Sequence, residues 1–383
     1  MKNSADRILT THVGSLPRSQ AVTDVVFARD RGTPLDETLA RTTIATAVRD
    51  VVRRQVDARI DVVSDGEMSK ISYATYIKER LTGFAGDTPR EPGQDLVEFP
   101  RILAKLAALG ATAKYTRPRC VGEIRVSTTA PLHVDLENMQ AAVAEAAPQE
   151  AFLNAASPGV IALFQPNDFY KTQDAYLEAV AEAMRIEYEG IVGAGFLLQI
   201  DAPDLGMGRH TMYRDRSVDE FLDRAAIHIE VLNHALRNVP ENRVRMHVCW
   251  GNYEGPHHHD VPLELLLPVV VKAKAQGLLF EGANPRHAHE WTVFRDQPIP
   301  ANKILIPGVI GSTTNYIEHP LLVAERIGHY ADCVGRERVM AGSDCGFGTF
   351  AGFGPVDPDV AYLKLQALSE GARIASDRLW GKH

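Results

Sequence analysis

Residues 244–252 read Val244-Arg245-Met246-His247-Val248-Cys249-Trp250-Gly251-Asn252. Side chains alternate along a strand with a period of two, so the valines and Met246 share one face while His247 and Cys249 share the other. Gly251 interrupts the apolar run, which places the imidazole and the thiol at the carboxyl end of the strand. In parallel α/β sheets this end opens the ligand crevice. The stretch therefore predicts a His-x-Cys pair at a binding site.

The pair itself favours a metal. Imidazole nitrogen and thiolate sulfur suit Zn²⁺, which needs two further ligands from elsewhere in the chain. Taken alone, however, such a pair is more often a buried thiol beside a hydrogen-bonded core histidine than a metal site. The remaining strands decide between these interpretations.

Short apolar segments alternate with helical patterns along the whole chain. The predicted strands begin at residues 8, 60, 152, 196, 244, 278, 303 and 339. The predicted helices cover 35–59, 134–145, 172–192, 218–238, 262–276, 317–334 and 358–374. Such alternation predicts an α/β fold, a (β/α)₈ TIM barrel, with a doubly wound open sheet as the runner-up. No linker divides the chain, so a single domain over residues 1–383 is expected.

Two segments need separate treatment. Cys120–Ser127 alternates apolar and polar residues and is predicted to be a strand in a small β-hairpin insertion. Val160–Leu163 is wholly apolar and is predicted to belong to the one buried strand of the segment that begins at 152.

The composition sets the broad class of protein. The chain has 383 residues, 45% apolar and 23% charged, as expected of a soluble globular protein. It has no apolar run of about 18 residues and no secretory signal, so we expect a cytoplasmic protein without a membrane partner. Four cysteines are too few for a disulfide framework, and a net charge of −8 argues against nucleic acid. A homo-oligomer is compatible with these features.

Reacting groups of barrels lie at the carboxyl ends of strands. The candidates there are Glu67, Asp201, His247, Cys249, Glu281 and Cys345. The predicted zinc ligands are His247, Cys249, Cys345 and, as the weakest, Glu281. Two thiolates leave the metal little positive charge for activating water, whereas it can still bind a third thiol and hold it as a thiolate. We therefore predict alkyl transfer from a small-molecule donor to a small-molecule thiol.

Six motifs, in order and spacing, resemble the catalytic domain of cobalamin-independent methionine synthases over nearly the whole chain. They are residues 11–18 (Thr-His-Val-Gly-Ser-Leu-Pro-Arg), 65–67 (Asp-Gly-Glu), 199–201 (Gln-Ile-Asp), 247–249 (His-Val-Cys), Glu281 and 344–346 (Asp-Cys-Gly). The resemblance implies a barrel of the methionine synthase and uroporphyrinogen decarboxylase (UROD) type. It also implies zinc on His247, Cys249, Glu281 and Cys345, with Ser15, Glu67 and Asp201 around the polar end of homocysteine.

The chain departs from that family at two strand ends. Asp201 is followed by Ala202-Pro203, where the methionine synthases have Glu-Pro. Gly311-Ser312-Thr313 stands where they carry Asp-Ile-His, whose histidine resembles a proton donor for the folate leaving group. The chain also lacks the N-terminal half that full-length methionine synthases use to hold polyglutamyl folate. Methyl transfer from folate is therefore not the first expectation.

Epoxyalkane:coenzyme M transferases, a lyase group of about this length, resemble the same barrel and zinc motif. The predicted function is accordingly epoxide opening by zinc-bound coenzyme M. The alternative is methyl transfer to homocysteine, directly or from a corrinoid protein. The candidates for binding the sulfonate are Arg18, Lys70 and Arg209, with His210 and Arg286 also considered. The candidates for protonating the opened oxygen are His12, Tyr253 and His319, with Tyr73 also considered.

Other metal interpretations fit less well. A hydrolytic zinc would need ligands dominated by His and Asp, and a structural zinc would need ligands close together in sequence. His257-His258-His259 and His287-Ala288-His289 are predicted to be polar loops over the barrel mouth. Cys120 and Cys333 are predicted to be buried thiols.

Overall fold

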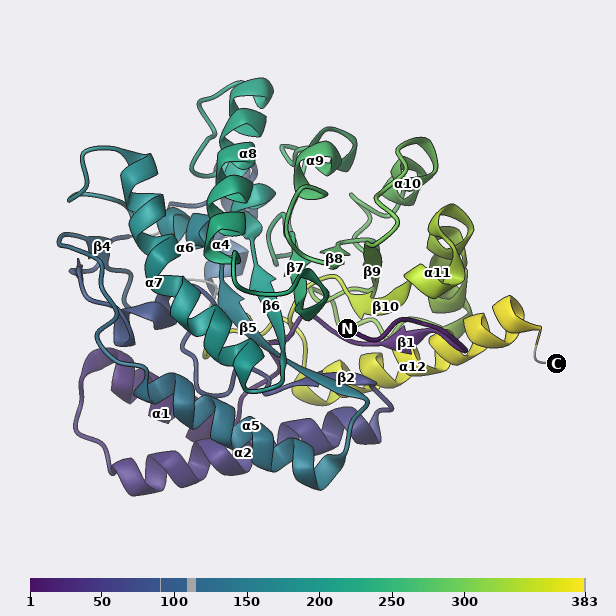
Figure 1. Cartoon of the computed structure of the whole chain (residues 1–383), viewed down its shortest axis with the longest axis horizontal. Coiled ribbons are helices and arrows are strands. Elements are labelled where there is room, and N and C mark those ends of the chain that lie inside the picture. The colour runs from purple at the N-terminus through teal and green to yellow at the C-terminus, as the bar shows by residue number, and fades with distance from the viewer. Residues whose placement is uncertain (90, 109–114, 382–383) are drawn as a thin grey trace.

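Eight parallel strands form one curved sheet in the computed structural model, which describes residues 1–89, 91–108 and 115–381. The strand order is β1-β10-β9-β8-β7-β6-β5-β2. Their bounds are β1 (Leu9–Thr10), β2 (Val62–Ser64), β5 (Glu150–Ala156), β6 (Leu197–Asp201), β7 (Val244–His247), β8 (Gly277–Phe280), β9 (Ile304–Ile310) and β10 (Met340–Ser343). The two edges meet where Asp61 N donates to Thr10 O (3.1 Å) and Thr11 Oγ1 donates to Val62 O (2.9 Å). The predicted (β/α)₈ barrel is confirmed (Figure 1).

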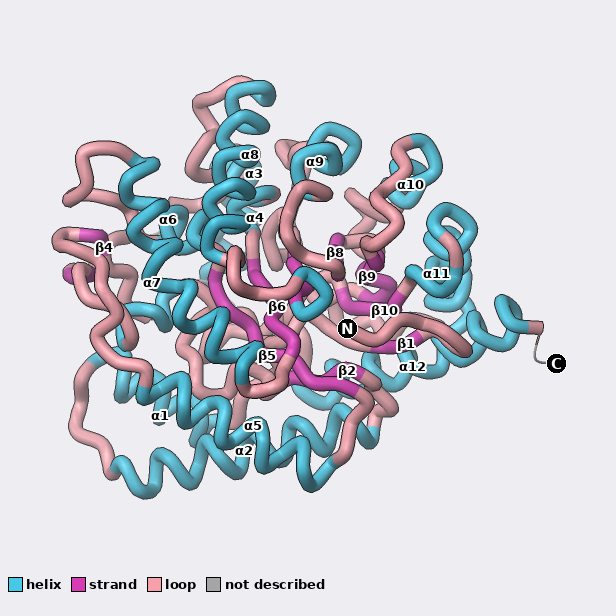
Figure 2. The backbone as a smooth tube through the Cα atoms, viewed as in Figure 1, coloured by secondary structure: helices cyan, strands magenta, loops and turns pink. Residues whose placement is uncertain are grey.

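Helices surround the strands (Figure 2). The long ones are α1 (Gln20–Arg31), α2 (Glu37–Asp57), α5 (Ala130–Ala146), α7 (Gln173–Gly193), α8 (Val218–Ala235), α11 (Pro320–Val334) and α12 (Pro358–Trp380). The short ones are α3 (Gln94–Val97), α4 (Pro100–Leu106), α6 (Pro158–Phe164), α9 (Leu263–Val270) and α10 (Val293–Asp296). Among the described residues, no helix is long and apolar enough to span a bilayer.

The segment Val160–Leu163 is helical, so the prediction of a strand there is wrong. It belongs to α6, which follows β5 directly. Ser157 caps the helix by accepting a hydrogen bond from Val160 N (2.9 Å), and Pro158 occupies the first turn. Serine followed by proline is a helix start, because proline needs no donor there and its φ is already helical. The capping signal outweighs the apolar run.

The predicted hairpin insertion is present but much shorter than expected. β3 (Phe84–Ala85) pairs antiparallel with β4 (Arg119–Cys120). Beyond Cys120 the segment predicted as a strand contributes one isolated bridge, between Val126 and Leu81. The alternation of side chains here reflects an extended loop held by single contacts.

Two helix predictions also need correction. α9 ends at Val270 rather than Gln276, because Lys274 N donates to Asn233 Oδ1 on α8 (2.6 Å) instead of continuing the helix. α1 was not predicted. Its start is marked by Ser19, whose side chain accepts from Val22 N (3.3 Å).

The barrel interior is filled by side chains and a buried cation. Its apolar members come from seven of the eight strands: Leu9, Val62, Phe152, Leu197, Leu279, Ile304, Ile306 and Met340. Arg245 of β7 is fully buried among them and donates to Thr11 Oγ1 (2.8 Å) and His12 O (2.7 Å). Burial lowers the pKa of this guanidinium to about 9. Because side chains two apart share a face, His247 also points inward, one layer closer to the carboxyl end.

The contact between β9 and β10 leaves no room for a side chain at Gly308. A Cβ there would lie 2.5 Å from Asp344 Cα and 2.6 Å from Asp344 N. Gly308→Ala should therefore lower the free energy of unfolding by about 3 kcal/mol, at the upper end of overpacking costs. Urea denaturation followed by circular dichroism measures this loss.

Gly311→Ala is the matched control, since its Cβ would meet only Glu318 Oε1 at 3.5 Å. It should change the free energy of unfolding by less than about 1 kcal/mol. Equal losses in the two variants would contradict the packing argument.

Candidate metal and substrate site

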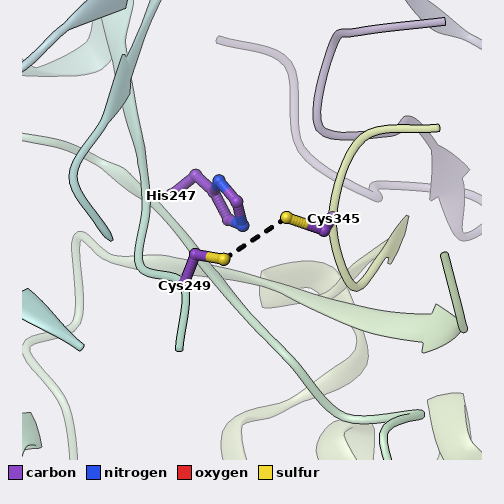
Figure 3. A group of neighbouring side chains, drawn as sticks. All are labelled: His247, Cys249 and Cys345. Carbon is purple, nitrogen blue, oxygen red and sulfur yellow. Dashed lines mark hydrogen bonds between the residues drawn. The ribbon is translucent and has the colours of Figure 1, made fainter. Parts of the chain in front are cut away.

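His247, Cys249 and Cys345 converge at the carboxyl end of the barrel (Figure 3). His247 ends β7, Cys249 follows two residues later, and Cys345 lies just beyond β10. Their ligand atoms all lie within 4.8 Å of one another, and the two sulfurs are 3.4 Å apart. All three side chains are buried. The structure thus brings together three of the four predicted ligands.

The imidazole is held in a defined orientation. His247 Nδ1 lies 3.5 Å from Asp201 Oδ1, and Nε2 lies 3.2 Å from the carbonyl oxygen of Asp344, the residue before Cys345. A carboxylate on one ring nitrogen is the usual partner of a metal-binding histidine, because it fixes the ring and raises its basicity. Nε2 is therefore the ring nitrogen on the side of the sulfurs (Figure 3).

The electrostatics favour charge separation within the cluster. The hydrogen bond with Cys249, together with the His247 charge, lowers the pKa of Cys345. The same hydrogen bond and burial raise the pKa of Cys249. Burial opposes protonation of His247, but Cys345 and Asp201 raise its pKa to about 10. A soft divalent cation can take the place of the protons on this imidazole and these thiols. The donor set therefore fits zinc.

Glu281, the fourth predicted ligand, is buried nearby but is turned to other partners. Its Oε1 accepts from Trp250 N (3.0 Å) and its Oε2 from Asn284 Nδ2 (2.9 Å). Its oxygens are not within 4.8 Å of all three other ligand atoms. As a metal ligand Glu281 stays a prediction, and binding would require its carboxylate to exchange one of these hydrogen bonds.

A cavity of about 580 Å³ opens over the cluster. Its polar lining includes Ser15, Glu67 and Asp201, so the structure brings these predicted residues to the thiols. A Cβ on Gly346 would lie 1.9 Å from Ser15 Oγ, which puts that hydroxyl against the residue after Cys345. The apolar lining comes largely from the segment between β2 and α5 and from the loop after β10: Tyr73, Leu96, Leu103, Leu106, Tyr115, Phe350 and Phe353.

Glu67 is the most perturbed acid of the cavity. Burial, and then repulsion by Asp201, raises its pKa. Its Oε2 is buried without a hydrogen-bond partner among the described residues. Its backbone adopts the left-handed conformation (φ 57°), which is uncommon for glutamate and marks a position fixed by its surroundings. Two interacting acids, Glu67 and Asp201, therefore line the same cavity.

Arg18, Lys70 and Arg209 do not line the cavity, which corrects their assignment to a bound sulfonate. Arg18 donates to the carbonyl oxygens of Glu67 and Gly348. Lys70 Nζ donates to Asn154 O (2.5 Å), and Arg209 donates to Tyr213 O (3.3 Å). Arg18 thus holds two loops, Lys70 holds strand β5, and Arg209 holds the turn that follows it in sequence. Arg286, the further candidate for binding the sulfonate, is exposed.

His12 and His319 also lie outside the cavity lining. Both nitrogens of His12 are engaged, since Nε2 lies 2.6 Å from Gln55 Oε1 and Nδ1 accepts from Gly14 N (3.1 Å). His319 is exposed and caps α11. The structure therefore gives neither residue access to a substrate. Tyr253 does line the cavity, with its hydroxyl donating to Asp95 Oδ2 (2.8 Å).

His257 and His287 are buried, which corrects their prediction as polar loop residues. Asp260 Oδ2 lies 2.9 Å from His257 Nδ1 and 2.9 Å from His287 Nε2. Its other oxygen lies 3.1 Å from His210 Nδ1, and His210 lines the cavity. Sequence reasoning missed Asp260 and Asp95. The spacing His257-x-x-Asp260 was the available signal for the first.

The neighbouring pair His258 and His259 stays outside this cluster. Their Nε2 atoms lie 2.8 and 2.6 Å from the two oxygens of Glu98, at the surface. Each carboxylate oxygen is thus already paired with an imidazole.

The fold and the site together describe a (β/α)₈ barrel suited to a metal-dependent enzyme, with a His-Cys-Cys cluster beside two carboxylates. A family model for the catalytic domain of cobalamin-independent synthases matches residues 8–91. The methionine synthase of Saccharolobus solfataricus is 23% identical over 374 residues, covering 97% of this chain and 95% of the relative. That of Saccharolobus islandicus is 24% identical over 377 residues, with the same coverage.

Solved structures agree with the fold. A B12-independent methionine synthase from Shewanella, in complex with selenomethionine, is similar with a TM-score of 0.73 and 19% identity over 98% of this chain and 99% of that one. A putative vitamin-B12 independent methionine synthase from Listeria monocytogenes has a TM-score of 0.64 and 17% identity over 96% and 98%. The chain is thus similar to methionine synthases over nearly its whole length, and residues 8–91 match the catalytic-domain model of the cobalamin-independent synthases. The comparisons give no support to the narrower resemblance to epoxyalkane:coenzyme M transferases.

Replacing either thiol should abolish metal binding. We expect Cys249→Ser and Cys345→Ser to lower zinc affinity more than about 100-fold, since even the loss of an outer partner of a metal ligand costs about 10- to 100-fold. Zinc content after dialysis measures this, and the thiolate-to-cobalt absorption of Co²⁺-loaded protein gives a readout without activity.

Cys333→Ser is the matched control, because this half-buried thiol lies elsewhere and contacts Trp291 O (3.7 Å). It should retain zinc in full. A Cys345→Ser variant that kept stoichiometric zinc would show that the cluster is not the metal site.

Proposed function

We propose that this protein is a zinc-dependent methyltransferase that uses homocysteine as the methyl acceptor. The relatives named methionine synthase support this proposal, as does a donor set of two thiols and one imidazole at the barrel mouth. They favour the methyl-transfer alternative over epoxide opening by coenzyme M.

The observation that carries the choice of thiol is the carboxylate pair Glu67 and Asp201. Both line the cavity that contains Cys249 and Cys345, and Glu67 Oε2 has no hydrogen-bond partner among the described residues. An α-ammonium group placed between them would offset one negative charge of the pair and satisfy the unpaired oxygen. A sulfonate in the same place would instead add negative charge beside them.

The remaining cavity lining agrees with an amino-acid thiol. Of the described lysines and arginines, Arg117 alone lines the cavity, and its Nη2 donates to Phe164 O (3.4 Å). The hydroxyl of Ser15 offers a donor to the substrate's carboxylate. The amino acid's two charged groups thus have candidate partners next to the thiol cluster.

His247, Cys249 and Cys345 would hold the zinc, with Glu281 as the exchangeable fourth ligand. A bound zinc ion would lower the pKa of the incoming thiol and keep it as a thiolate at neutral pH. Asp201 serves twice, because it orients His247 and faces the substrate's ammonium group. Asn154 Nδ2 and Gln199 Nε2 fix Asp201 by donating to its two oxygens (2.8 and 3.0 Å).

The transfer forms a bond between the homocysteine sulfur and the methyl carbon. The bond from that carbon to the donor's leaving atom breaks, and the leaving atom keeps the electron pair. The thiol proton passes to solvent. The apolar cavity lining, including Leu96, Phe350 and Phe353, limits water around the reacting carbon. It also accommodates the apolar part of the methyl donor.

Removing one acid of the pair should weaken homocysteine binding selectively. We expect Glu67→Gln to raise KM for homocysteine about 10- to 100-fold, since a charge-assisted hydrogen bond contributes about 1.5–3 kcal/mol. KM for 4-mercaptobutyrate, which lacks only the amino group, should change less than about 3-fold. Thiol consumption with methyl iodide as the methyl donor measures both.

The exposed Glu137→Gln on α5 is the control and should change neither KM. Equal KM increases for the two thiols in Glu67→Gln would contradict a role in ammonium binding. Faster methylation of coenzyme M than of homocysteine by the unmodified protein would overturn the proposed function.

A further inference from the structure

We propose that His210, positioned by Asp260, protonates the leaving atom of the methyl donor, and that the donor therefore leaves through a nitrogen or an oxygen. The inference rests on the proposed thiol methyl transfer and names the class of its second substrate. It also addresses a gap in the sequence, because Thr313 stands where the resembling family has its proton-donating histidine.

The position of His210 follows from a contact with the thiol cluster. His210 ends the 3₁₀ helix η4 (Met207–His210). Met207 N donates to Cys249 O (2.9 Å), which anchors the start of η4 at the residue that carries one thiol. Three residues of a 3₁₀ helix advance about 6 Å. His210 lines the same cavity as Cys249 and Cys345.

The His210 ring presents one nitrogen that nothing satisfies. Its side chain is fully buried, and Nε2 has no hydrogen-bond partner among the described residues. A Cβ on Gly93, which also lines the cavity, would lie 3.4 Å from Nε2. The absence of a side chain at Gly93 keeps this nitrogen accessible from the cavity. A buried, unpaired ring nitrogen at a cavity wall points to a ligand that completes its hydrogen bonding.

The other nitrogen faces a carboxylate. Nδ1 lies 3.1 Å from Asp260 Oδ1, an ion-pair contact that is not yet aligned as a hydrogen bond. Catalytic hydrogen bonds are often misaligned without substrate and tighten in the complex. A carboxylate beside Nδ1 holds the ring in one orientation, which leaves Nε2 for the substrate.

Asp260 is itself held by two further imidazoles. Burial opposes charge on His257 and His287, but Asp260 raises their pKa values to about 9 and about 10, with Glu290 also acting on His287. His257 Nε2 donates to Tyr253 O (3.0 Å), and His287 Nδ1 donates to Glu290 Oε2 (2.8 Å). Every nitrogen of these two rings is therefore committed, and neither ring lines the cavity. They fix Asp260 Oδ2 and leave Oδ1 to His210.

Tyr253 is the competing acid in the cavity wall. Its hydroxyl donates to Asp95 Oδ2 (2.8 Å), and burial together with Asp95 raises its pKa above the ordinary tyrosine value. A proton held in this way is a poor one to donate at neutral pH. The geometry assigns the proton transfer to His210.

The step balances without a further reactant. As the sulfur–methyl bond forms, the electron pair of the breaking carbon–nitrogen or carbon–oxygen bond stays on the leaving atom, which takes the proton from His210 Nε2. His210 regains a proton from solvent. The homocysteine thiol has released one, so no net proton is consumed.

The test compares donors that need a proton with one that does not. Zinc-loaded protein and homocysteine are incubated with one alkyl donor at a time. The leaving atom needs a proton in 5-methyltetrahydropteroylglutamate (a nitrogen) and in epoxypropane (an oxygen). Methyl iodide needs none, because iodide leaves unprotonated. General acids contribute about 100-fold or more. We expect His210→Gln to lower kcat at least about 100-fold with whichever nitrogen or oxygen donor is used, but less than about 3-fold with methyl iodide.

Retained methyl iodide activity also shows that the variant is folded and metal-loaded. His259→Gln, at the rim and outside the cavity lining, is the matched control and should leave all rates unchanged. Equal loss with both kinds of donor, or no loss with either, overturns the role of His210.

The unmodified protein separates this inference from the proposed function. Failure to methylate homocysteine even with methyl iodide would overturn the proposed function. Use of methyl iodide but of neither the nitrogen nor the oxygen donor would overturn the His210 inference and leave thiol methyl transfer standing.

Discussion

The contact between the sulfurs of Cys249 and Cys345 is the constraint on which the rest of the site depends. Strands β7 and β10 are separated by β8 and β9, so they lie three spacings apart. At about 4.8 Å per spacing this amounts to about 14 Å along the sheet. The sulfurs are nevertheless 3.4 Å apart. Only the curvature of a nearly closed barrel, with both side chains directed across its mouth, brings them together.

Burial of the thiols then determines the electrostatics around them. His247 faces Cys345 on one side and Asp201 on the other, so one imidazole links the thiol cluster to the carboxylate pair. Burial is the larger cause of the raised pKa of Glu67, and Asp201 raises it further. Charges introduced by a metal or by a substrate's amine therefore act on the same short chain of groups. This coupling supports the proposed ligand, which carries both a thiol and an ammonium group.

The cavity divides its roles between rigid strands and connecting segments. The thiol cluster and Asp201 lie at strand ends, where the sheet fixes their geometry. The apolar wall and His210 belong to loops and short helices after the strands. Barrels vary their chemistry in these segments while the strand ends stay fixed. We therefore assign thiol activation to the strand ends, and the handling of the donor to η4 and its neighbours.

The sequence by itself determined the barrel and the residues of its His-Cys-Cys cluster. Each predicted strand starts within two residues of an observed one, because short apolar runs between turn residues specify buried parallel strands locally. The His-x-Cys spacing placed both groups on one face for the same local reason. The start of α6 was also encoded locally, in Ser157-Pro158, and the apolar run after it obscured that signal.

Tertiary structure decided which polar groups face the cavity. Arg18 and Lys70 have long side chains that reach backbone carbonyls of segments far away in the sequence, and sequence spacing does not define that reach. His210, His257 and His287 meet at Asp260 from separate segments, although 77 positions separate the first from the last. Local patterns specify which elements form. The closed barrel specifies which side chains become neighbours, because that depends on distances across its mouth.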